Sequence, residues 1–267
     1  MPARVLHVSD LHIGRRETPE PISALRELVA KLTPELVLAT GDLAHRGQRS
    51  ELARAADLLL SLDTTVLAVP GNHDIPYTVP ARFTRSFATW EHFFGRTEPV
   101  YASEGLFVVG LNSVRPWLHQ GGALTEPQLT RAATLLREAP GGALRLVALH
   151  HHLAAPPWRA GHKRPLRRRD HVLRSLAEAG AELVVGGHVH QAGIAERREF
   201  EALEDGATGS LVLATAPGLG RPRPQRRGEA RGINVYESDT NTLDITSFAW
   251  DGSGYTEIGR RSFRRGV

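Results

Sequence analysis

Clusters of aspartate, asparagine and histidine follow five apolar segments in this sequence of 267 residues. Each cluster begins where its apolar segment ends: Asp10-Leu11-His12, Gly41-Asp42, Gly71-Asn72-His73-Asp74, His150-His151-His152 and Gly187-His188-Val189-His190. Short apolar runs that stop at glycine or at polar residues predict buried strands. The carboxyl ends of the strands form the ligand crevice in open α/β sheets. We therefore expect these side chains to converge.

The donor types in these clusters indicate metal binding. Carboxylate, amide and imidazole donors without any cysteine suit Mn²⁺, Fe²⁺/³⁺, Zn²⁺, Co²⁺ or Ni²⁺. The candidate ligands exceed what one ion needs: Asp10, His12, Asp42, Asn72, one histidine of the triplet, His188 and His190. Two ions about 3.5–4 Å apart can activate a hydroxide between them and stabilise both oxygens of a phosphoryl displacement. The sequence therefore predicts a dinuclear site, with the identity of the metals left open.

The order of these motifs resembles that of the calcineurin-like metallophosphoesterase superfamily, over about two-thirds of the chain. This resemblance implies a four-layer αββα sandwich, in which two mixed β-sheets are flanked by helices. It also implies a phosphoric ester hydrolase that works by in-line attack of a metal-bridging hydroxide. The pattern Gly-x-Leu-x-x-x-Gln-Leu at 122–129 resembles the narrower branch of class III cyclic nucleotide phosphodiesterases and glycerophosphodiesterases.

The resemblance also implies a role for each motif residue. Asp10, His12 and His190 would hold the first ion. Asn72 and His188 would hold the second, and Asp42 would bridge the two. His73 would bind no metal. From its chemistry we expect the His73 imidazolium to protonate the leaving oxygen, and we expect Asp74 beside it to hold the ring and favour its charged form.

The histidine triplet leaves the register of one ligand open. Related sequences have His-His-Pro after the strand, with the first histidine as the ligand, and here Leu153 stands where His-His-His-Pro would place proline. This register predicts His151 as the ligand, with His150 as the alternative. Alternation along a strand agrees, since it points His151 to the opposite side from His150 and His152.

Length and composition indicate an ordinary α/β protein. A chain of 267 residues with 41% apolar residues can bury a full core, so we expect one domain. Within it, residues 1–190 predict βαβ units and residues 191–267 a mainly antiparallel part. No cysteine, no leader-like segment after Met1 and no apolar run of about 20 residues favour a cytoplasmic protein without membrane contact. The oligomeric state stays open, and a homodimer is one alternative.

Several helices follow from periodicity. Apolar spacing predicts a helix that starts near Pro21, a second over Ser50–Leu62 and an aromatic-faced one over Pro80–Phe94. Thr125 is a good N-cap for a helix that ends near Glu138. The aromatic face is expected to pack in the core.

Two arginine-rich segments, 159–169 and 221–231, are either solvated loops or phosphate-binding loops. Arginine binds phosphate oxygens in a bidentate manner. Arg221 and Arg223 are therefore candidate substrate ligands, and His45, three residues after Asp42, is another. His119 is a further candidate for substrate contact, and His7, inside the first strand, is expected to be structural.

The function we expect is hydrolysis of a small or nucleotide-like phosphodiester. A DNA exonuclease of the recombination type is the main alternative, which would make nucleic acid the partner. Such nucleases carry additional domains, and we expect none here. Less favoured functions are those of a phosphomonoesterase, a pyrophosphatase, a protein phosphatase or a non-catalytic scaffold. The scaffold is disfavoured because every expected metal position has a competent donor.

Overall fold

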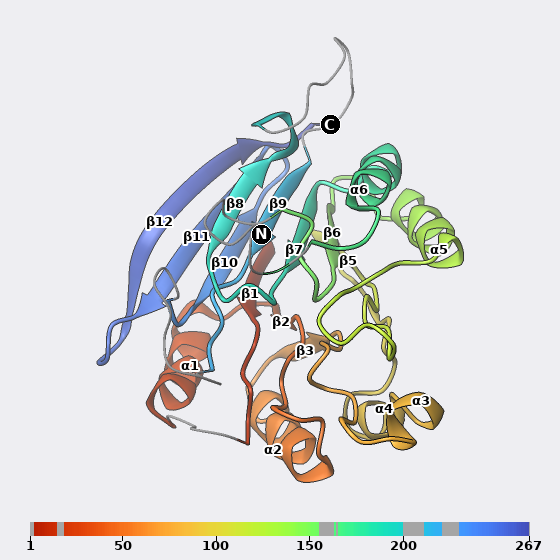
Figure 1. Ribbon diagram of the computed structural model, residues 1–267. Helices are drawn as coiled ribbons and strands as arrows, with labels where there is room; N and C mark the ends of the chain where they lie inside the picture. The colour runs from red at the N-terminus through yellow and green to blue at the C-terminus, as the bar shows by residue number, and fades with distance from the viewer. Residues whose placement is uncertain are drawn as a thin grey trace.

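The computed structural model describes residues 3–14, 19–154, 163, 165–199, 211–220 and 230–266. The described strands form two sheets, which lie face to face with helices on the outside (Figure 1). This is the four-layer αββα arrangement, so the predicted fold class is confirmed. The division of the chain into a single domain with two parts stays a prediction.

The first sheet joins the start of the chain to its end. Its six described strands lie in the order β12 (Tyr255–Arg264), β11 (Thr242–Trp250), β10 (Gly232–Ser238), β1 (Ala3–Val8), β2 (Leu36–Ala39) and β3 (Thr65–Ala68). β1, β2 and β3 are parallel, and β10 joins β1 in the antiparallel sense. The parallel strands are connected by the helices α1 (Pro19–Leu32) and α2 (Arg49–Leu60), close to the positions that periodicity predicts.

The second sheet contains the middle of the chain. Its six described strands lie in the order β4 (Val100–Ala102), β5 (Leu106–Gly110), β6 (Leu144–Ala148), β7 (Leu183–Gly186), β9 (Val212–Thr215) and β8 (Gly193–Glu196). The helices α5 (Glu126–Arg137) and α6 (Arg169–Glu178) connect its parallel strands and cover its outer face (Figure 1). Thr125 caps α5 as predicted, because its side chain accepts a hydrogen bond from the Gln128 amide.

In the part expected to be mainly antiparallel, residues 191–267, one strand also pairs in parallel. β10, β11 and β12 are antiparallel, as expected. β9, however, pairs with β7 in parallel and with β8 in the antiparallel sense. The chain reverses between β7 and β8, and β9 lies between these two strands in the sheet. This order could not be inferred from residue patterns, because both arrangements bury the same apolar residues.

The aromatic segment at 80–94 is broken into two short helices, α3 (Ala81–Thr84) and α4 (Ala88–Phe94). The Ser86 hydroxyl donates to the carbonyl oxygen of Arg82, and Arg85 leaves the helical region. Side-chain hydrogen bonds of this kind compete with the helical ladder. Trp90 on α4 is fully buried in the core, as expected, whereas Phe83 on α3 is exposed.

Three apolar layers hold these elements together. One lies between the two sheets and contains side chains from both. The other two lie between the first sheet and α1, α2 and α4, and between the second sheet and α5 and α6. Burial of apolar surface stabilises the folded state by about 25 cal/mol per Å². The strand ends that carry the polar motifs are thus fixed by packing on both sides. No helix in the described part of the chain is long and apolar enough to cross a membrane.

Candidate metal centre and active site

The structure brings the five polar motifs together at the carboxyl ends of β1, β2, β3, β6 and β7. The first three strands belong to one sheet and the last two to the other, so the site lies where the two sheets meet. The amide of His188 donates to Oδ2 of Asp10 at 2.9 Å, which links motifs 178 residues apart in the sequence. The predicted convergence is therefore confirmed.

The first group of donors surrounds the free oxygen of Asp10. Asp10 Oδ2 accepts hydrogen bonds from the Ser9 hydroxyl and the His188 amide, so Oδ1 is the oxygen left for a ligand. The Nε2 atom of His190 lies 3.2 Å from this oxygen. The Nε2 atoms of His190 and His12 are 3.3 Å apart. These three buried side chains each bring one ligand atom within 4.8 Å of the others, which suits a single cation.

Asp42 lies between this group and a second group of donors. Its Oδ2 atom is 3.7 Å from Nε2 of His12, and its Oδ1 atom is 3.4 Å from Nε2 of His150. His150 Nε2 in turn lies 3.1 Å from Nδ1 of His188. The two oxygens of one carboxylate thus face two sets of imidazoles.

Asn72 is expected to belong with this second group of potential metal ligands. Its side chain is 1% exposed, and within the described residues neither its amide oxygen nor its amide nitrogen has a hydrogen-bond partner. Buried polar groups without partners are rare, because each costs about 1–3 kcal/mol. The same holds for Asp10 Oδ1, His151 Nε2 and His188 Nε2. Unpaired donor atoms of these types, where the strand ends of the two sheets meet, fit metal ions, so the residues present suit the predicted dinuclear site.

The backbone at the site is strained. Five of the predicted ligands have positive φ angles: Asp10 (54°), His12 (48°), Asp42 (52°), His188 (70°) and His190 (57°). Residues with side chains rarely adopt this region, at a cost of about 1–3 kcal/mol each. Such strain persists where the surroundings enforce a functional geometry. No residue pattern predicted it.

Close packing around the ligands depends on two glycines. A Cβ atom at Gly71 would lie 2.4 Å from Oδ1 of Asp42, and one at Gly187 would lie 2.5 Å from Oδ2 of Asp10. Both distances are far inside van der Waals contact. The glycines that precede Asn72 and His188 in the motifs are therefore needed to let the carboxylates approach the backbone.

Burial and mutual charge set the protonation of the metal-free site. Burial opposes ionisation of Asp42, but the nearby His150 and His73 outweigh it and hold the pKa of Asp42 far below its usual range. Burial likewise opposes protonation of His150, yet the charge of Asp42 raises its pKa to about 9. His188 and His151 are neutral, because burial lowers their pKa values well below 6.5. A cation near Asp42 would therefore displace a proton from His150, as expected when metal ligands are protonated in the free protein.

Two histidines of the triplet, His150 and His151, lie close to His188. Nδ1 of His150 donates to the Thr40 carbonyl oxygen at 2.7 Å, which orients Nε2 toward Asp42. Nδ1 of His151 lies 2.8 Å from the Ser113 hydroxyl, and its Nε2 is unpaired. Both rings, together with His188, form a cluster of donors. The assignment of His151 stays a prediction, and the distances bring the alternative, His150, closer to Asp42.

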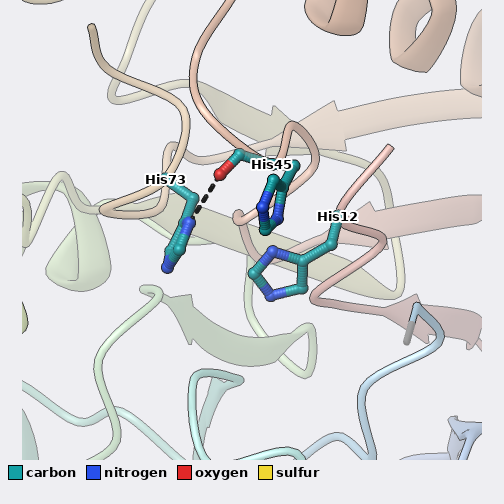
Figure 2. Close-up of side chains that lie close together, drawn as sticks. All are labelled: His12, His45 and His73. Carbon is teal, nitrogen blue, oxygen red and sulfur yellow. Dashed lines mark hydrogen bonds between the residues drawn. The ribbon is translucent and has the colours of Figure 1, made fainter. Parts of the chain in front are cut away.

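His73 lies beside the first group, on the more open side of the site. Figure 2 shows His73, His45 and His12 around one space, and the His73 ring is 4.8 Å from the His12 ring. Nδ1 of His73 donates to the carbonyl oxygen of His45 at 2.7 Å, which leaves Nε2 for other contacts. The His45 ring is 5.9 Å from that of His73, so the predicted substrate contact of His45 remains geometrically reasonable.

Asp74 does not hold the ring of His73 as expected. Its two carboxylate oxygens accept hydrogen bonds from the backbone amides of Ala44 and Gly71, each at 2.8 Å. It therefore fixes the turn that carries Asn72, and burial together with the charge of Asp42 raises its pKa to about 8. The two side chains point in different directions. That of Asp74 turns toward the backbone of its own turn and of Ala44, whereas the His73 ring faces the His45 carbonyl oxygen.

Sequence reasoning missed several residues around the site. The Tyr77 hydroxyl lies 2.7 Å from Nδ1 of His73, and the ammonium group of Lys163 donates to the His188 carbonyl oxygen at 2.5 Å. Ser113 had a detectable signal, since it follows a strand end, and Lys163 lies in the arginine-rich segment 159–169 already considered as a phosphate-binding loop, whereas Tyr77 belongs to no motif. The candidate substrate ligands Arg221 and Arg223 lie outside the described residues.

The Gln128 side chain of the Gly-x-Leu-x-x-x-Gln-Leu pattern has a structural role. It donates to the Asn112 carbonyl oxygen at 2.9 Å, and it also contacts Glu98 and Arg115. These contacts anchor the start of α5 to the loop after β5, which contains Ser113. Gln128 thus holds a loop beside the site in place and has no part in the chemistry.

Comparison with known proteins agrees with this geometry. The model of the calcineurin-like phosphoesterase family matches residues 3–192. A probable cyclic nucleotide phosphodiesterase from Synechococcus sp. is 29% identical over 211 residues, which cover 74% of this chain and 77% of the relative.

Solved structures show the same fold. A dimetal phosphatase from Danio rerio superposes over the whole of both chains, with a TM-score of 0.66 and 13% identity. A purple acid phosphatase from yellow lupin (Lupinus luteus) has a TM-score of 0.72 and 11% identity, over all of this chain and 54% of that one. The matched motifs, the buried clusters of metal-ligand type and the family match lead to one conclusion: this chain is a metal-dependent phosphoric ester hydrolase of the calcineurin-like phosphoesterase family.

Proposed function

We propose that this protein is a dinuclear phosphodiesterase that acts on small or nucleotide-like phosphodiesters. The observation that carries the proposal is the position of Asp42, whose two oxygens face His12 and His150 on opposite sides. Asp10, His12 and His190 then hold the first ion. Asn72, His188 and one histidine of the triplet hold the second.

The distances around Asp42 support His150 as the triplet ligand. A metal-bound histidine usually donates its other ring N–H to a carbonyl or carboxylate, which fixes its orientation. His150 does so to Thr40, and its Nε2 points to both Asp42 and His188. His151, whose Nδ1 contacts the Ser113 hydroxyl, would then lie next to the second ion or bind it together with His150.

The ions supply Lewis acidity and an activated water when they are bound. The chain supplies the remaining steps. Water oxygen forms a bond to phosphorus and releases one proton to solvent, while the bond from phosphorus to the leaving oxygen breaks. His73 gives its Nε2 proton to that oxygen, and the His45 carbonyl keeps the ring turned for this transfer through Nδ1–H. The donor set of imidazoles, carboxylates and one amide suits Mn, Fe, Zn, Co or Ni.

The relative from Synechococcus is named a probable cyclic nucleotide phosphodiesterase, and this supports a diester over a monoester. Arg221 and Arg223 are proposed to hold the anionic substrate at the mouth of the site. Replacing both by alanine should then raise KM more than it lowers kcat, which is the sign of lost uniform binding.

A substrate panel tests the proposal. Protein reconstituted with each metal is offered bis-p-nitrophenyl phosphate, p-nitrophenyl phosphate, cyclic AMP and single-stranded DNA. We expect the diesters to have the highest kcat/KM. A preference for p-nitrophenyl phosphate would indicate a phosphomonoesterase, and efficient degradation of DNA would indicate the exonuclease; either result would overturn the proposal.

A further inference from the structure

A row of aromatic rings extends outward from His73. The Tyr77 ring lies 5.5 Å from the His73 ring, and the Tyr77 hydroxyl is 3.3 Å from its Nε2. The His119 ring follows at 5.7 Å from Tyr77, edge to face. Tyr77 is half-buried and His119 is exposed, so the row leads from the site to the surface.

Arg82 fixes the two loops that carry these rings. Its side chain is buried, its Nε donates to the Pro116 carbonyl oxygen at 2.8 Å, and its Nη1 donates to that of Pro76 at 3.1 Å. Its guanidinium also lies 5.9 Å from the centre of the Tyr77 ring. The segment 76–80 and the loop 113–119 are therefore held against each other at the rim of the site.

The loop held by Arg82 also exposes a large apolar side chain. Trp117 directly follows Pro116 and is 68% exposed, which is unusual for tryptophan. Neither Trp117 nor His119 is needed to fill the core. On a loop that Arg82 holds at the rim of the site, such a side chain offers a planar surface on which an aromatic ring can stack.

We propose that Tyr77, Trp117 and His119 form a subsite for the leaving group of the diester, and that this group carries a planar aromatic ring, as the base of a nucleoside does. The inference rests on the proposed function, in which His73 protonates the leaving oxygen. The leaving group must then lie on the His73 side of the phosphorus, next to Tyr77. Aliphatic leaving groups such as glycerol would leave the aromatic surface unused.

The magnitude follows from stacking. Alanine replacement of a side chain that stacks on a base weakens binding by about 5- to 150-fold. Each of Trp117→Ala and His119→Ala should therefore lower kcat/KM for cyclic AMP, relative to that for a glycerophosphodiester, by a factor in this range. His92→Ala, at an exposed histidine on α4, is the matched control and should leave the ratio unchanged.

A binding measurement separates the subsite from catalysis. Adenosine 5′-monophosphate and glycerol 3-phosphate both carry a phosphate, but only the nucleotide carries a base, and calorimetry gives their Kd values for the metal-loaded protein. We expect Trp117→Ala to raise the Kd of the nucleotide by about 5- to 150-fold and that of glycerol phosphate much less.

The two proposals fail in different ways. If the wild type cleaves both diesters but the variants change neither the ratio nor the nucleotide Kd, the subsite is refuted and the phosphodiesterase stands. If the wild type cleaves no diester, the proposed function is refuted. The calorimetric comparison then still decides whether the rings bind a base: equal changes in both Kd values would overturn the subsite.

Discussion

Replacement of Gly71 by alanine should disturb the metal centre through Asp42. A Cβ atom at position 71 would lie 2.2 Å from the amide nitrogen of Asp42 and 2.4 Å from its Oδ1, where ordinary contacts begin near 3.4 Å. Because the nearest of these atoms belongs to the backbone, the 70–74 turn or the backbone at 41–42 must move by about 1 Å, which displaces the carboxylate of Asp42 relative to Asn72. Misplacement of this size costs about 10²-fold in rate, and overpacking costs about 1–3 kcal/mol of stability.

The assay combines three measurements on Gly71→Ala. We expect kcat/KM on bis-p-nitrophenyl phosphate to fall about 10²-fold, the affinity for at least one ion to fall and the melting temperature to drop by several degrees. Gly141→Ala is the matched control, because nothing lies within 4 Å of a Cβ atom there. If Gly71→Ala binds both ions normally and keeps its rate, the close approach of the turn to Asp42 has no functional role, and the reasoning is refuted.

Three further predictions rest on named contacts. His73→Ala should retain both ions but lose about 10²–10⁴-fold more activity with alkoxide leaving groups than with p-nitrophenolate, which needs no proton; equal losses would remove His73 from the acid role. His150→Ala should lower metal content more than His151→Ala does, and the reverse order by elemental analysis would restore His151 as the ligand. His7, buried between Tyr236 and Thr40, has its pKa lowered by burial to about 3, so it stays neutral when folded and protonates when unfolded. Its contribution to stability is complete above pH 6.5 and is lost as the pH falls from 6.5 toward 3, by up to about 1.4 kcal/mol per pH unit. In metal-free protein, the free energy of unfolding in urea should therefore depend less on pH in His7→Gln than in the wild type. An identical pH dependence of the two would contradict this.

The strand-end motifs could be predicted because two rules act together. Apolar runs such as Val5–Val8 must be buried, and parallel strands must deliver the residues after them to one edge of the sheet. Those rules place Asp10 near Asp42 at the edge of one sheet and His150 near His188 at the edge of the other, whereas the meeting of the two edges depends on how the sheets pack. The structural role expected for His7 is confirmed for the same reason, since its ring is buried within β1.

The finer geometry depends on contacts that residue patterns do not contain. Alternation along a strand predicts His151 as the ligand, and this stays a prediction. The strand ends at Ala148, and Nδ1 of His150 donates to the Thr40 carbonyl oxygen, which turns Nε2 of His150 toward Asp42. In the same way, the expected partner of His73 was its neighbour in sequence. The ring instead contacts the His45 carbonyl oxygen, which comes from another loop, and the Tyr77 hydroxyl. The loops around a strand end set the direction of the side chains that follow it. Because these loops have no periodic residue pattern, the direction cannot be predicted from the sequence.

The central claim is that Asp42 joins two metal ions in one active site. The most direct test is to measure bound metal by elemental analysis, together with activity, in the wild type and in Asp42→Ala, with the exposed Asp57→Ala on α2 as the control. We expect about two ions per chain and full diesterase activity in the wild type and the control. In Asp42→Ala we expect one ion or none, and no activity. A fully occupied pair of ions in Asp42→Ala would contradict the claim.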